Sequence, residues 1–330
     1  MKKYTADRLI ESARGFQEAS ILIAAAELDV FTSLHSRPAG SEELARRIHG
    51  DPRGMRILLD ALASLGLLEK RDGMYAVDAD LAGLLTETGT DSILGMLRHQ
   101  GNCMRRWNQL AKVVLTGNPI RDQESVRGAA GDTVSFIRAM HEISGRIAPA
   151  LVKSLGPLQF THLLDIGGAS GTWTIPFMQI YPGAKATIFD IPEVIPLAGD
   201  VLKAPGMAGR IRLVAGDFYT DTLPPGADLA WVSAIVHQNS REQNRALFLK
   251  VFTALDAGGK ILIRDVVMEE SRTAPVMGAF FAVNMLVGTP GGGTFTFNEL
   301  KEDLASAGFT DVNLLRKGEV MDTVVGASKP

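Results

Sequence analysis

Cysteine is almost missing from this sequence: Cys103 is the only one in 330 residues. A single cysteine excludes a disulfide within the chain and is typical of a reducing compartment, so we expect a cytoplasmic protein. Nothing near Cys103 in the sequence would activate its thiol, which favours packing over nucleophilic chemistry. The first residues lack the apolar core of a secretion signal, and no apolar run has the length of a membrane-spanning helix.

A surplus of either charge is also missing. The chain has 34 lysines and arginines against 37 aspartates and glutamates, which gives a formal net charge of −3, and the two signs are interspersed. Such a balance provides no general attraction to nucleic acids or anionic membranes, so we expect neither as a partner. The length allows two domains with a substantial core.

Two common nucleotide-binding signatures are absent as well. The dinucleotide fingerprint requires a glycine two positions after Gly167, where Ala169 stands, and no Gly-Lys-Ser/Thr phosphate loop occurs. The sequence instead has Asp165-x-Gly167-x-x-x-Gly171 between an apolar, strand-like run and a helix-like segment. The glycines allow the backbone to approach a ligand closely. Asp165 would repel a phosphate and suits a ligand that carries an ammonium group.

Two further aspartates follow apolar runs. Asp190 ends the strand-like segment 186–189, and Asp217 follows the segment 211–215 and Gly216. Open α/β sheets bind ligands at the carboxyl ends of parallel strands, and an acid at the tip of the second strand commonly binds ribose hydroxyls. Each aspartate alone could be a helix cap or a turn residue. Aspartates at three successive strand ends favour a nucleoside site.

Several segments carry a family resemblance in their order and spacing. They are Leu164–Gly168, Phe189–Pro192, Gly216–Tyr219, the run that ends in His237, Gly258–Ile263 and Pro290–Gly292. The chain resembles, over nearly its whole length, the class I S-adenosylmethionine-dependent methyltransferases. Within them it is similar to the small-molecule O-methyltransferases of plant caffeate and bacterial polyketide or hydroxyneurosporene type.

The resemblance implies the fold, the cofactor and the oligomeric state. We expect an α/β protein with a Rossmann-like, seven-stranded methyltransferase sheet and an N-terminal all-α winged-helix dimerisation domain. S-adenosyl-L-methionine would be the cofactor and S-adenosyl-L-homocysteine the product, with no metal, and the chain would form a homodimer through its N-terminal domain. The partner would be a small-molecule acceptor.

The resemblance also implies which residues bind the cofactor. Gly167 and Gly168 would approach the methionine part, Asp190 would hold the ribose, and Asp217 with Phe218 would frame the adenine. The full set that we expect to bind the cofactor is Asp165, Gly167, Gly168, Gly171, Asp190, Ile191, Gly216, Asp217, Phe218 and Ser233.

We expect three regions along the chain: a winged helix over residues 1–91, a helical linker that roofs the acceptor pocket over 92–157, and the catalytic domain over 158–330. The first region contains an apolar helix from Phe16 to Phe31, helices that open at Ser41 and at Asp51, and a hairpin with the turn Asp72-Gly73. Three helices and a hairpin are typical of a winged helix. The linker contains a polar segment, 117–131, that we expect to be a loop.

A winged helix could also bind DNA. The helix after Asp51 carries Arg53 and Arg56, but its body is mostly leucine and alanine. A recognition helix needs polar groups that reach base edges and a basic surround. Because this helix is built to pack, we favour dimer contacts over a DNA-associated regulator.

His237 and Asp265 are the candidate catalytic residues. We expect strands over 228–236 and 260–264 to end at these two side chains, so that both face one crevice. The final strands, near 307–315 and 322–327, should form an antiparallel pair at one sheet edge. A neutral imidazole can remove the proton of an acceptor hydroxyl, and an adjacent carboxylate fixes its tautomer. The resemblance makes His237 the base and Asp265 its acidic partner.

The pKa of the acceptor's hydroxyl limits which class of acceptor the enzyme can use. A phenol with a pKa near ~10 gives its proton to a histidine of pKa near ~6.5 at a cost of roughly 5 kcal/mol, whereas an aliphatic alcohol would cost on the order of 12 kcal/mol. We therefore expect a phenolic or enolic hydroxyl on a small aromatic or polyketide-like acceptor. Its candidate contacts are Trp107, Phe136, Met140 and His141 of the linker and Phe281, Asn284 and Met285 of a later apolar helix. Core packing is an equally good interpretation of Trp107 and Phe136.

The sequence departs from the family pattern near the histidine. Gln238-Asn239 follow it where the family usually has Asp-Trp, and Ser233 stands where a lysine is frequent in the plant enzymes. Thr294 lies in the segment where the family has a second acid. These departures leave two alternatives open: catalysis mainly by proximity, and a relative that binds the cofactor but performs C-methylation or cofactor-assisted hydroxylation.

Overall fold

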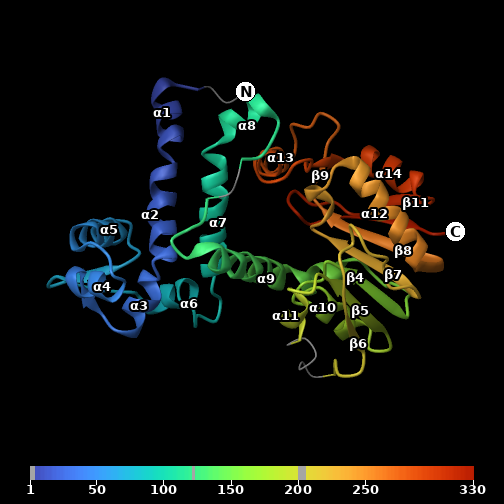
Figure 1. Ribbon diagram of the computed structural model, residues 1–330, viewed down its shortest axis with the longest axis horizontal. Coiled ribbons are helices and arrows are strands. Elements are labelled where there is room, and N and C mark those ends of the chain that lie inside the picture. Colours follow the sequence, from blue (N-terminus) through green and yellow to red (C-terminus); the bar gives the residue numbers. More distant parts are fainter. Residues whose placement is uncertain (1–3, 121–122, 200–205) are drawn as a thin grey trace. The chain divides into compact units, whose positions relative to one another are not determined.

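The computed structural model describes residues 4–120, 123–199 and 206–330. The chain forms two compact units (Figure 1), of which the first contains Met1–Arg105 and Asp122–Ile143 and the second contains Arg106–Arg121 and Ser144–Pro330. Among the described residues, no helix combines the length and the apolar character needed to cross a membrane. The region boundaries expected at residues 91 and 157 stay predictions.

The first unit is a helical domain with a small antiparallel sheet of order β1-β3-β2. Its elements are α1 (Ala6–Arg14), α2 (Phe16–Glu27), α3 (Val30–Ser36), β1 (Ala39–Gly40), α4 (Ser41–Arg47), α5 (Pro52–Ser64), β2 (Glu69–Arg71), β3 (Met74–Ala76), α6 (Ala79–Leu85), most of α7 (Leu94–Trp107) and the start of α9 (Gly128–Ser154). Phe31, Leu59, Leu62 and Tyr75 are fully buried in its core. Each such side chain contributes roughly 1.5–3 kcal/mol by leaving water. The N-terminal helical domain with a hairpin is confirmed.

The apolar helix expected from Phe16 to Phe31 is wrong in one respect, because two helices occupy this range. Asp29 breaks it with a left-handed backbone, φ 58°. The buried guanidinium of Arg98 holds this bend: Nη2 donates to Asp29 Oδ1 at 2.8 Å and Nε donates to the carbonyl of Ala26 at 2.9 Å. The loop expected over 117–131 is also too long, since α9 begins at Gly128, and residues 121–122 lie outside the described part.

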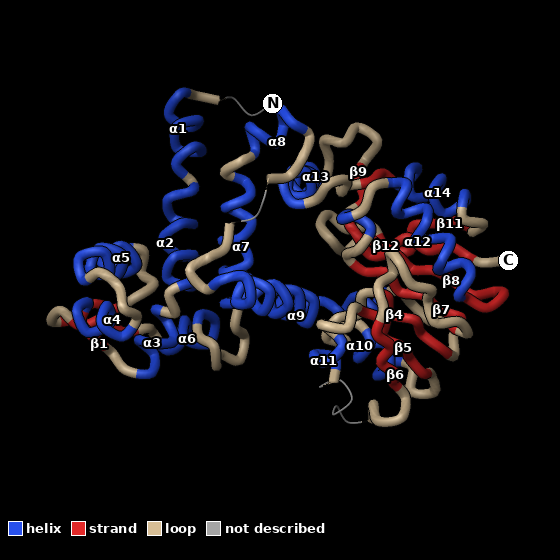
Figure 2. Tube along the Cα trace, in the orientation of Figure 1, coloured by secondary structure: helices blue, strands red, loops and turns tan. Residues whose placement is uncertain are grey.

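The second unit is built on a seven-stranded sheet of order β11-β12-β8-β7-β4-β5-β6 (Figure 2). Its elements after α8 (Leu110–Thr116) and the end of α9 are β4 (His162–Ile166), α10 (Thr174–Ile180), β5 (Lys185–Asp190), α11 (Ile195–Ala198), β6 (Ile211–Ala215), β7 (Ala227–Ser233), the 3₁₀ turn η2 (Val236–Gln238), α12 (Arg241–Ala254), β8 (Leu255–Asp265), β9 (Val267–Met268), α13 (Val276–Gly288), β10 (Phe295–Thr296), α14 (Phe297–Ser306), β11 (Thr310–Arg316) and β12 (Thr323–Ser328). β12 runs antiparallel to both neighbours, whereas β4–β8 are parallel. The α/β sheet with an antiparallel edge pair is confirmed.

Helices cover both faces of this sheet, with α12 and α14 on one side and α10 and α11 on the other (Figure 1). Side chains of a strand alternate between the faces. On β7, Val232 packs with the α12 side and Trp231 packs with Phe177 of α10. This alternation decides which strand-end residues share a face, and it is used again below.

Candidate active site

The strand order creates a switch point beside β4. The chain places β5 and β6 on one side of β4 and then returns to place β7 and β8 on the other. Open α/β sheets bind ligands at such a point, outside the carboxyl ends of the strands. The predicted residues that the structure brings to this edge are Gly167, Gly168 and Gly171 after β4, Asp190 and Ile191 at β5, Gly216, Asp217 and Phe218 after β6, Ser233 at the end of β7 and Asp265 at the end of β8.

The turn after β4 requires glycine. Gly167 has φ 65° and Gly171 has φ 72°, both in the left-handed region. A Cβ at Gly167 would also lie 2.6 Å from Cδ1 of Ile235. The Gly167 amide donates to the Phe189 carbonyl at 2.8 Å, and the Ala169 amide donates to Asp190 Oδ2 at 2.7 Å. The turn is therefore fixed to the tip of β5.

Asp165 lies beneath this turn. Its side chain is 1% exposed, and Thr174 Oγ1 donates to Asp165 Oδ2 at 2.5 Å. Burial raises the pKa of Asp165 to about 7, and the negative charge of Asp190 also raises it. The carboxylate thus links the turn to the first residue of α10. Direct contact of Asp165 with a ligand ammonium group stays a prediction.

Asp190 and the segment after β6 form the next part of the edge. Asp190 Oδ1 accepts from the Ile191 amide at 2.8 Å, and burial raises the pKa of Asp190. The Gly216 amide donates to the Asp190 carbonyl at 2.9 Å, and a Cβ at Gly216 would lie 2.5 Å from Cζ of Phe189. Asp217 Oδ1 accepts from the Tyr219 amide at 2.8 Å. These contacts bring a half-buried carboxylate and the half-buried ring of Phe218 to one edge.

His237 and Asp265 form an oriented pair. His237 Nδ1 lies 2.9 Å from Asp265 Oδ1 and 3.0 Å from Oδ2. The carboxylate also accepts from the His237 amide at 3.2 Å and from the Val266 amide at 2.7 Å, and Asp265 is buried. A carboxylate at Nδ1 keeps the proton there and leaves Nε2 as the basic atom. The structure thus provides an imidazole whose tautomer is set.

The expected strand 228–236 is too long at its C-terminal end. β7 stops at Ser233, and His237 lies on the 3₁₀ turn η2. The reason is local: Ala234 adopts φ 59°, which ends the extended backbone and turns the chain back over Asp265. The loop after α13 then supports the turn, since the Gly293 amide donates to the His237 carbonyl at 2.8 Å.

The predicted acceptor contacts divide between the two units. In the second unit, the rings of His237 and Phe281 lie edge to face at 4.8 Å, and Trp107 Nε1 donates to Asn284 Oδ1 at 2.8 Å. Met285 of the same helix is buried. Phe136, Met140 and His141 lie on the part of α9 that belongs to the first unit, where Phe136 packs against His99 at 5.1 Å. Their role in acceptor binding stays a prediction.

Sequence reasoning missed two residues at the site edge. Thr174 supports Asp165, and Arg264 is buried at the end of β8 beside Trp173. The sequence held a signal for Arg264, because an arginine that interrupts the apolar run 261–263 needs a partner.

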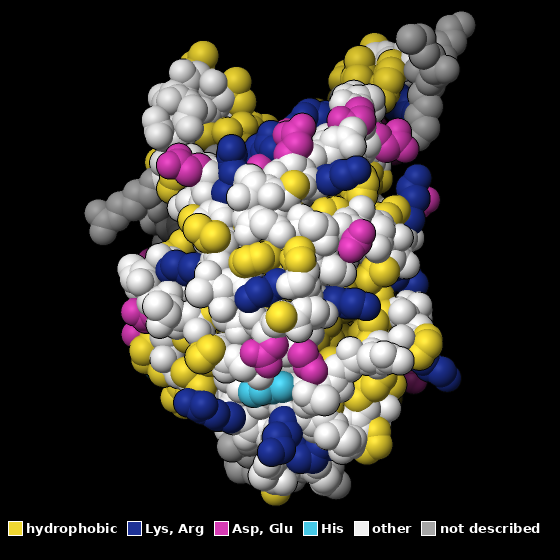
Figure 3. All heavy atoms as spheres, turned by 90° about the vertical axis from the view of Figure 1, so that its right-hand side faces the viewer, with side chains coloured by type: hydrophobic (Ala, Val, Ile, Leu, Met, Phe, Trp, Pro, Cys, Tyr) yellow, Lys and Arg dark blue, Asp and Glu magenta, His cyan; other side chains and the backbone are white. Residues whose placement is uncertain are grey.

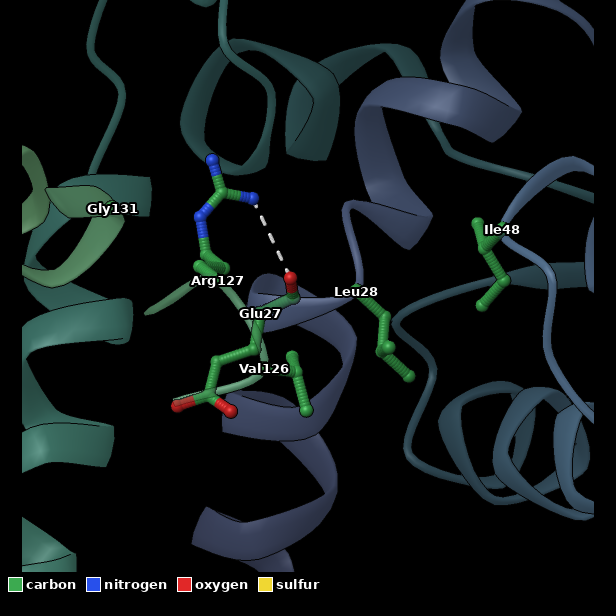
Figure 4. A pocket seen from close by; sticks show the side chains of 6 residues that line it. All are labelled: Glu27, Leu28, Ile48, Val126, Arg127 and Gly131. Carbon is green, nitrogen blue, oxygen red and sulfur yellow. Dashed lines mark hydrogen bonds between the residues drawn. The ribbon is translucent and has the colours of Figure 1, made fainter. Parts of the chain in front are cut away.

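A separate pocket of about 410 Å³ lies in the first unit (Figure 4). Its lining residues are Glu27, Leu28, Ile48, Val126, Arg127 and Gly131. The Arg127 guanidinium reaches across it to the Glu27 carbonyl at 3.5 Å. None of the predicted site residues lines it, so it carries no part of the chemistry below.

The face in Figure 3 shows acidic and basic side chains scattered among one another.

Known proteins match this chain over nearly its whole length. Residues 121–310 match the O-methyltransferase domain and residues 10–88 the O-methyltransferase dimerisation domain. The 3-hydroxy-5-methyl-1-naphthoate 3-O-methyltransferase of Streptomyces sahachiroi is 32% identical, over 93% of this chain and 90% of that protein. The tetracenomycin polyketide synthesis 8-O-methyl transferase TcmO of Streptomyces glaucescens is 30% identical, over 92% and 91%. The crystal structure of human N-acetylserotonin methyltransferase in complex with SAM is 29% identical, covers 99% of both chains and has a TM-score of 0.79.

The residues at the sheet edge fit S-adenosylmethionine, the cofactor of this family. Asp190 accepts one amide on each carboxylate oxygen, so each oxygen retains a lone pair for a ribose hydroxyl. The acidic edge also suits a ligand with a sulfonium and an ammonium group. Within the described ranges, no cluster of His, Cys, Asp and Glu could hold a metal ion. Since the domain match covers more than half of the sequence and the relatives align over nearly all of it, the chain belongs to the O-methyltransferase family and is an S-adenosylmethionine-dependent O-methyltransferase.

Proposed function

We propose that this enzyme methylates a phenolic or enolic hydroxyl of a small aromatic or polyketide-like acceptor, with His237 as the general base. The observation that carries the proposal is the contact of His237 Nδ1 with Asp265 at 2.9 Å, beside the ring of Phe281. One relative is named as the 3-O-methyltransferase of 3-hydroxy-5-methyl-1-naphthoate and another as the 8-O-methyl transferase of tetracenomycin polyketide synthesis, which supports this acceptor class.

The cofactor supplies a methyl group that is already activated by the positive charge on its sulfur. We assign Gly167, Gly168 and Gly171 to its methionine part, with Asp165 beneath them. Asp190 and Ile191 would bind the ribose, and Gly216, Asp217 and Phe218 the adenine. What supports this assignment is the position of all these residues at the carboxyl edge, next to the switch point.

His237 removes the proton of the acceptor hydroxyl through Nε2. Asp265 accepts from Nδ1 and stabilises the imidazolium that forms, and two backbone amides hold the carboxylate in place. A transfer from phenol to imidazole is uphill by roughly 5 kcal/mol, which this stabilisation and the activated methyl group offset. The same pair therefore supports a phenolic acceptor far better than an aliphatic alcohol.

Helix α13 provides the acceptor contacts in the second unit. Phe281 presents an aromatic ring next to the base, which suits a flat conjugated acceptor. Asn284 uses Oδ1 for Trp107, so its amide Nδ2 remains oriented and can donate to an acceptor oxygen. Met285 of the same helix is buried.

We also propose a cytoplasmic homodimer that forms through the dimerisation domain. Helix α1 has no buried residue. Two of its apolar side chains, Leu9 (55%) and Ile10 (50%), are exposed, and so is Phe16 (61%) at the start of α2. Exposed apolar side chains in one segment are typical of an interaction surface. An interface of this kind is the same patch on both subunits. The cytoplasmic location rests on the single cysteine.

Labelled S-adenosylmethionine with a panel of phenols, enols and aliphatic alcohols tests the function. We expect label on the oxygen of phenolic or enolic acceptors and none on the alcohols. Nuclear magnetic resonance of the product distinguishes an O-methyl from a C-methyl group. Methylation of alcohols at a comparable rate, or of ring carbons alone, would contradict the proposal.

A further inference from the structure

Two asparagines are buried against the turn that carries His237. Asn239 directly follows η2, and Asn244 lies near the start of α12. The exposed fraction of both residues is 0%. A buried amide is unfavourable unless its donor and acceptor atoms are paired. The partners of these two amides therefore indicate what they do in this place.

A row of hydrogen bonds connects the two amides to Tyr219 and to the backbone of η2. Asn244 Nδ2 donates to the Val236 carbonyl at 3.0 Å, and Asn239 Nδ2 donates to Asn244 Oδ1 at 3.0 Å. The Tyr219 hydroxyl donates to Asn239 Oδ1. Val236 directly precedes His237 in the chain, so this amide network ends one residue from the candidate base.

The Val236 carbonyl sets the direction of the whole amide network. A carbonyl oxygen can only accept, so Asn244 must turn Nδ2 toward it and present Oδ1 to Asn239. Asn239 must then donate through Nδ2 and present Oδ1 to Tyr219. Burial raises the pKa of Tyr219, and the charge of Asp217 raises it further, so the hydroxyl keeps the proton that it donates. Each amide thus has one orientation in which all these bonds form.

Both ends of the amide network are attached to α12. Asn244 belongs to this helix. Further along it, Lys250 donates from Nζ to three carbonyls of residues 218–221, at 2.8–2.9 Å. The loop that carries Tyr219 and the turn that carries His237 are therefore held to the same helix.

The position of the imidazole depends on this turn as well as on Asp265. Asp265 fixes the Nδ1 side of the ring, and the Gly293 amide holds the His237 carbonyl. The carbonyl on the other side of His237, that of Val236, is held by Asn244. Because transfer requires the reacting atoms to be aligned, a small displacement of Nε2 lowers the rate.

We propose that Asn239 and Asn244 are positioning residues for His237: the hydrogen bonds from Tyr219 through both amides to the Val236 carbonyl fix the turn on which the base lies. Asn239 is one of the positions at which this chain departs from the family pattern, so the amide network accompanies that departure. The inference rests on the proposed role of His237 as the general base.

A comparison in two backgrounds tests the proposal, with labelled S-adenosylmethionine and the best phenol of the acceptor panel. Asn244→Ala removes the donor to the Val236 carbonyl and should lower kcat about fivefold to thirtyfold, whereas Tyr219→Phe should lower it about threefold to tenfold. The KM for the phenol should change less than twofold. In His237→Ala, neither substitution should lower kcat further, because the base that they position is already lost.

Tyr181→Phe is the matched control. It removes a tyrosine hydroxyl that donates to the Gly156 carbonyl at 2.9 Å, in a part of the second unit to which we assign no catalytic role. We expect an unchanged kcat. If Asn244→Ala does not fold, Tyr219→Phe decides the test, because it removes a single oxygen from a partly exposed side chain.

Nuclear magnetic resonance tests the positioning without turnover. The proton on His237 Nδ1, held by Asp265, should give a slowly exchanging downfield signal in the wild type, identified by its loss in His237→Ala. We expect this signal to broaden or disappear in Asn244→Ala and Tyr219→Phe and to persist in Tyr181→Phe.

Two results would overturn the proposal. An equal fractional loss of kcat in the wild-type and His237→Ala backgrounds would mean that the amide network only stabilises the fold. An unchanged Nδ1 proton signal in both variants would mean that it does not fix the ring. A nearly unchanged kcat in His237→Ala itself is a different result, because it contradicts the proposed function, and the signal of the Nδ1 proton still decides whether the network holds the ring.

Discussion

The indole Nε1 of Trp107 donates a hydrogen bond to Oδ1 of Asn284, at 2.8 Å, across 177 positions of sequence. Trp107 is the last residue of α7, and Asn284 is a polar residue within the apolar helix α13. The bond fixes which end of the amide faces the indole, and so leaves the donor end for another oxygen. An isolated asparagine in an apolar helix thereby acquires a defined orientation.

We expect Asn284→Ala and Trp107→Phe each to raise the KM for the acceptor about threefold to tenfold, with little change in the KM for S-adenosylmethionine. Each variant removes one side of the same hydrogen bond, which is worth about 1 kcal/mol. The double variant should therefore lose less acceptor-binding free energy than the two single variants together. Met277→Ala, at an exposed position of α13, is the matched control. Unchanged acceptor affinity in Asn284→Ala would remove this role.

The pair of His237 and Asp265 leads to a second prediction. His237→Ala should lower kcat about a hundredfold or more, because general-base catalysis is lost, and should leave calorimetric binding of S-adenosylhomocysteine intact. Asp265→Asn should also lower kcat, because an amide cannot stabilise the imidazolium or enforce the Nδ1–H tautomer. His35→Ala, at an exposed histidine of α3, is the control.

The size of the loss in His237→Ala separates general-base catalysis from a proximity mechanism. If kcat barely changes in His237→Ala, the enzyme works by positioning the acceptor, as the departures at Gln238 and Thr294 had left open.

Helix α1 leads to a third prediction. Replacing exposed apolar side chains by charged ones, as in Ile10→Glu with Phe16→Glu, should weaken the homodimer at least tenfold, because charges would be buried in the interface. Sedimentation velocity over a concentration series measures the change. Leu249→Glu, which replaces an exposed leucine of α12 in the second unit, should leave the dimer unchanged. A wild-type protein that sediments as a monomer throughout would contradict the proposed interface.

Local patterns were sufficient to predict most of the fold. The apolar runs that end at Asp165, Asp190 and Asp265 predict strands because they are short, buried and followed by polar turns. The break at Asp29 and the early end of β7 at Ser233 escaped prediction, because both depend on non-glycine residues with positive φ, at Asp29 and Ala234. Aspartate is enriched at positive φ but adopts it only in a minority of cases, and alanine rarely does, so the residue type alone does not predict this conformation.

The sequence alone predicts site residues that follow neighbouring strands. It does not predict contacts that depend on how the strands pair across the sheet. His237 and Asp265 could be paired because both follow adjacent strands. The contact of Arg264 with Ser233 and Trp173 could not be predicted, since it depends on the register of β7 with β8 and on the path of the turn. The bond of Trp107 with Asn284 depends in the same way on tertiary packing within the second unit.

The buried Asp165 makes the last prediction, which concerns stability. Burial raises its pKa to about 7 in the folded protein, against ~3.9 in an unfolded chain. Below pH ~4 the carboxyl is protonated in both states. As the pH rises from ~4 to about 7, the unfolded state loses the proton first, so the free energy of unfolding falls through this window and then levels off. A shift of this size corresponds to on the order of 4 kcal/mol.

Asp165→Asn isolates this contribution, because the amide is neutral at every pH and its oxygen can still accept from Thr174 Oγ1. Urea titrations at several pH values should show the variant gaining stability relative to the wild type from pH ~4 to pH ~7, with no further gain above. Asp256→Asn, at an exposed position, should show no such gain. A constant difference between Asp165→Asn and wild type over this range would mean that Asp165 is charged throughout, held by the turn rather than penalised by burial.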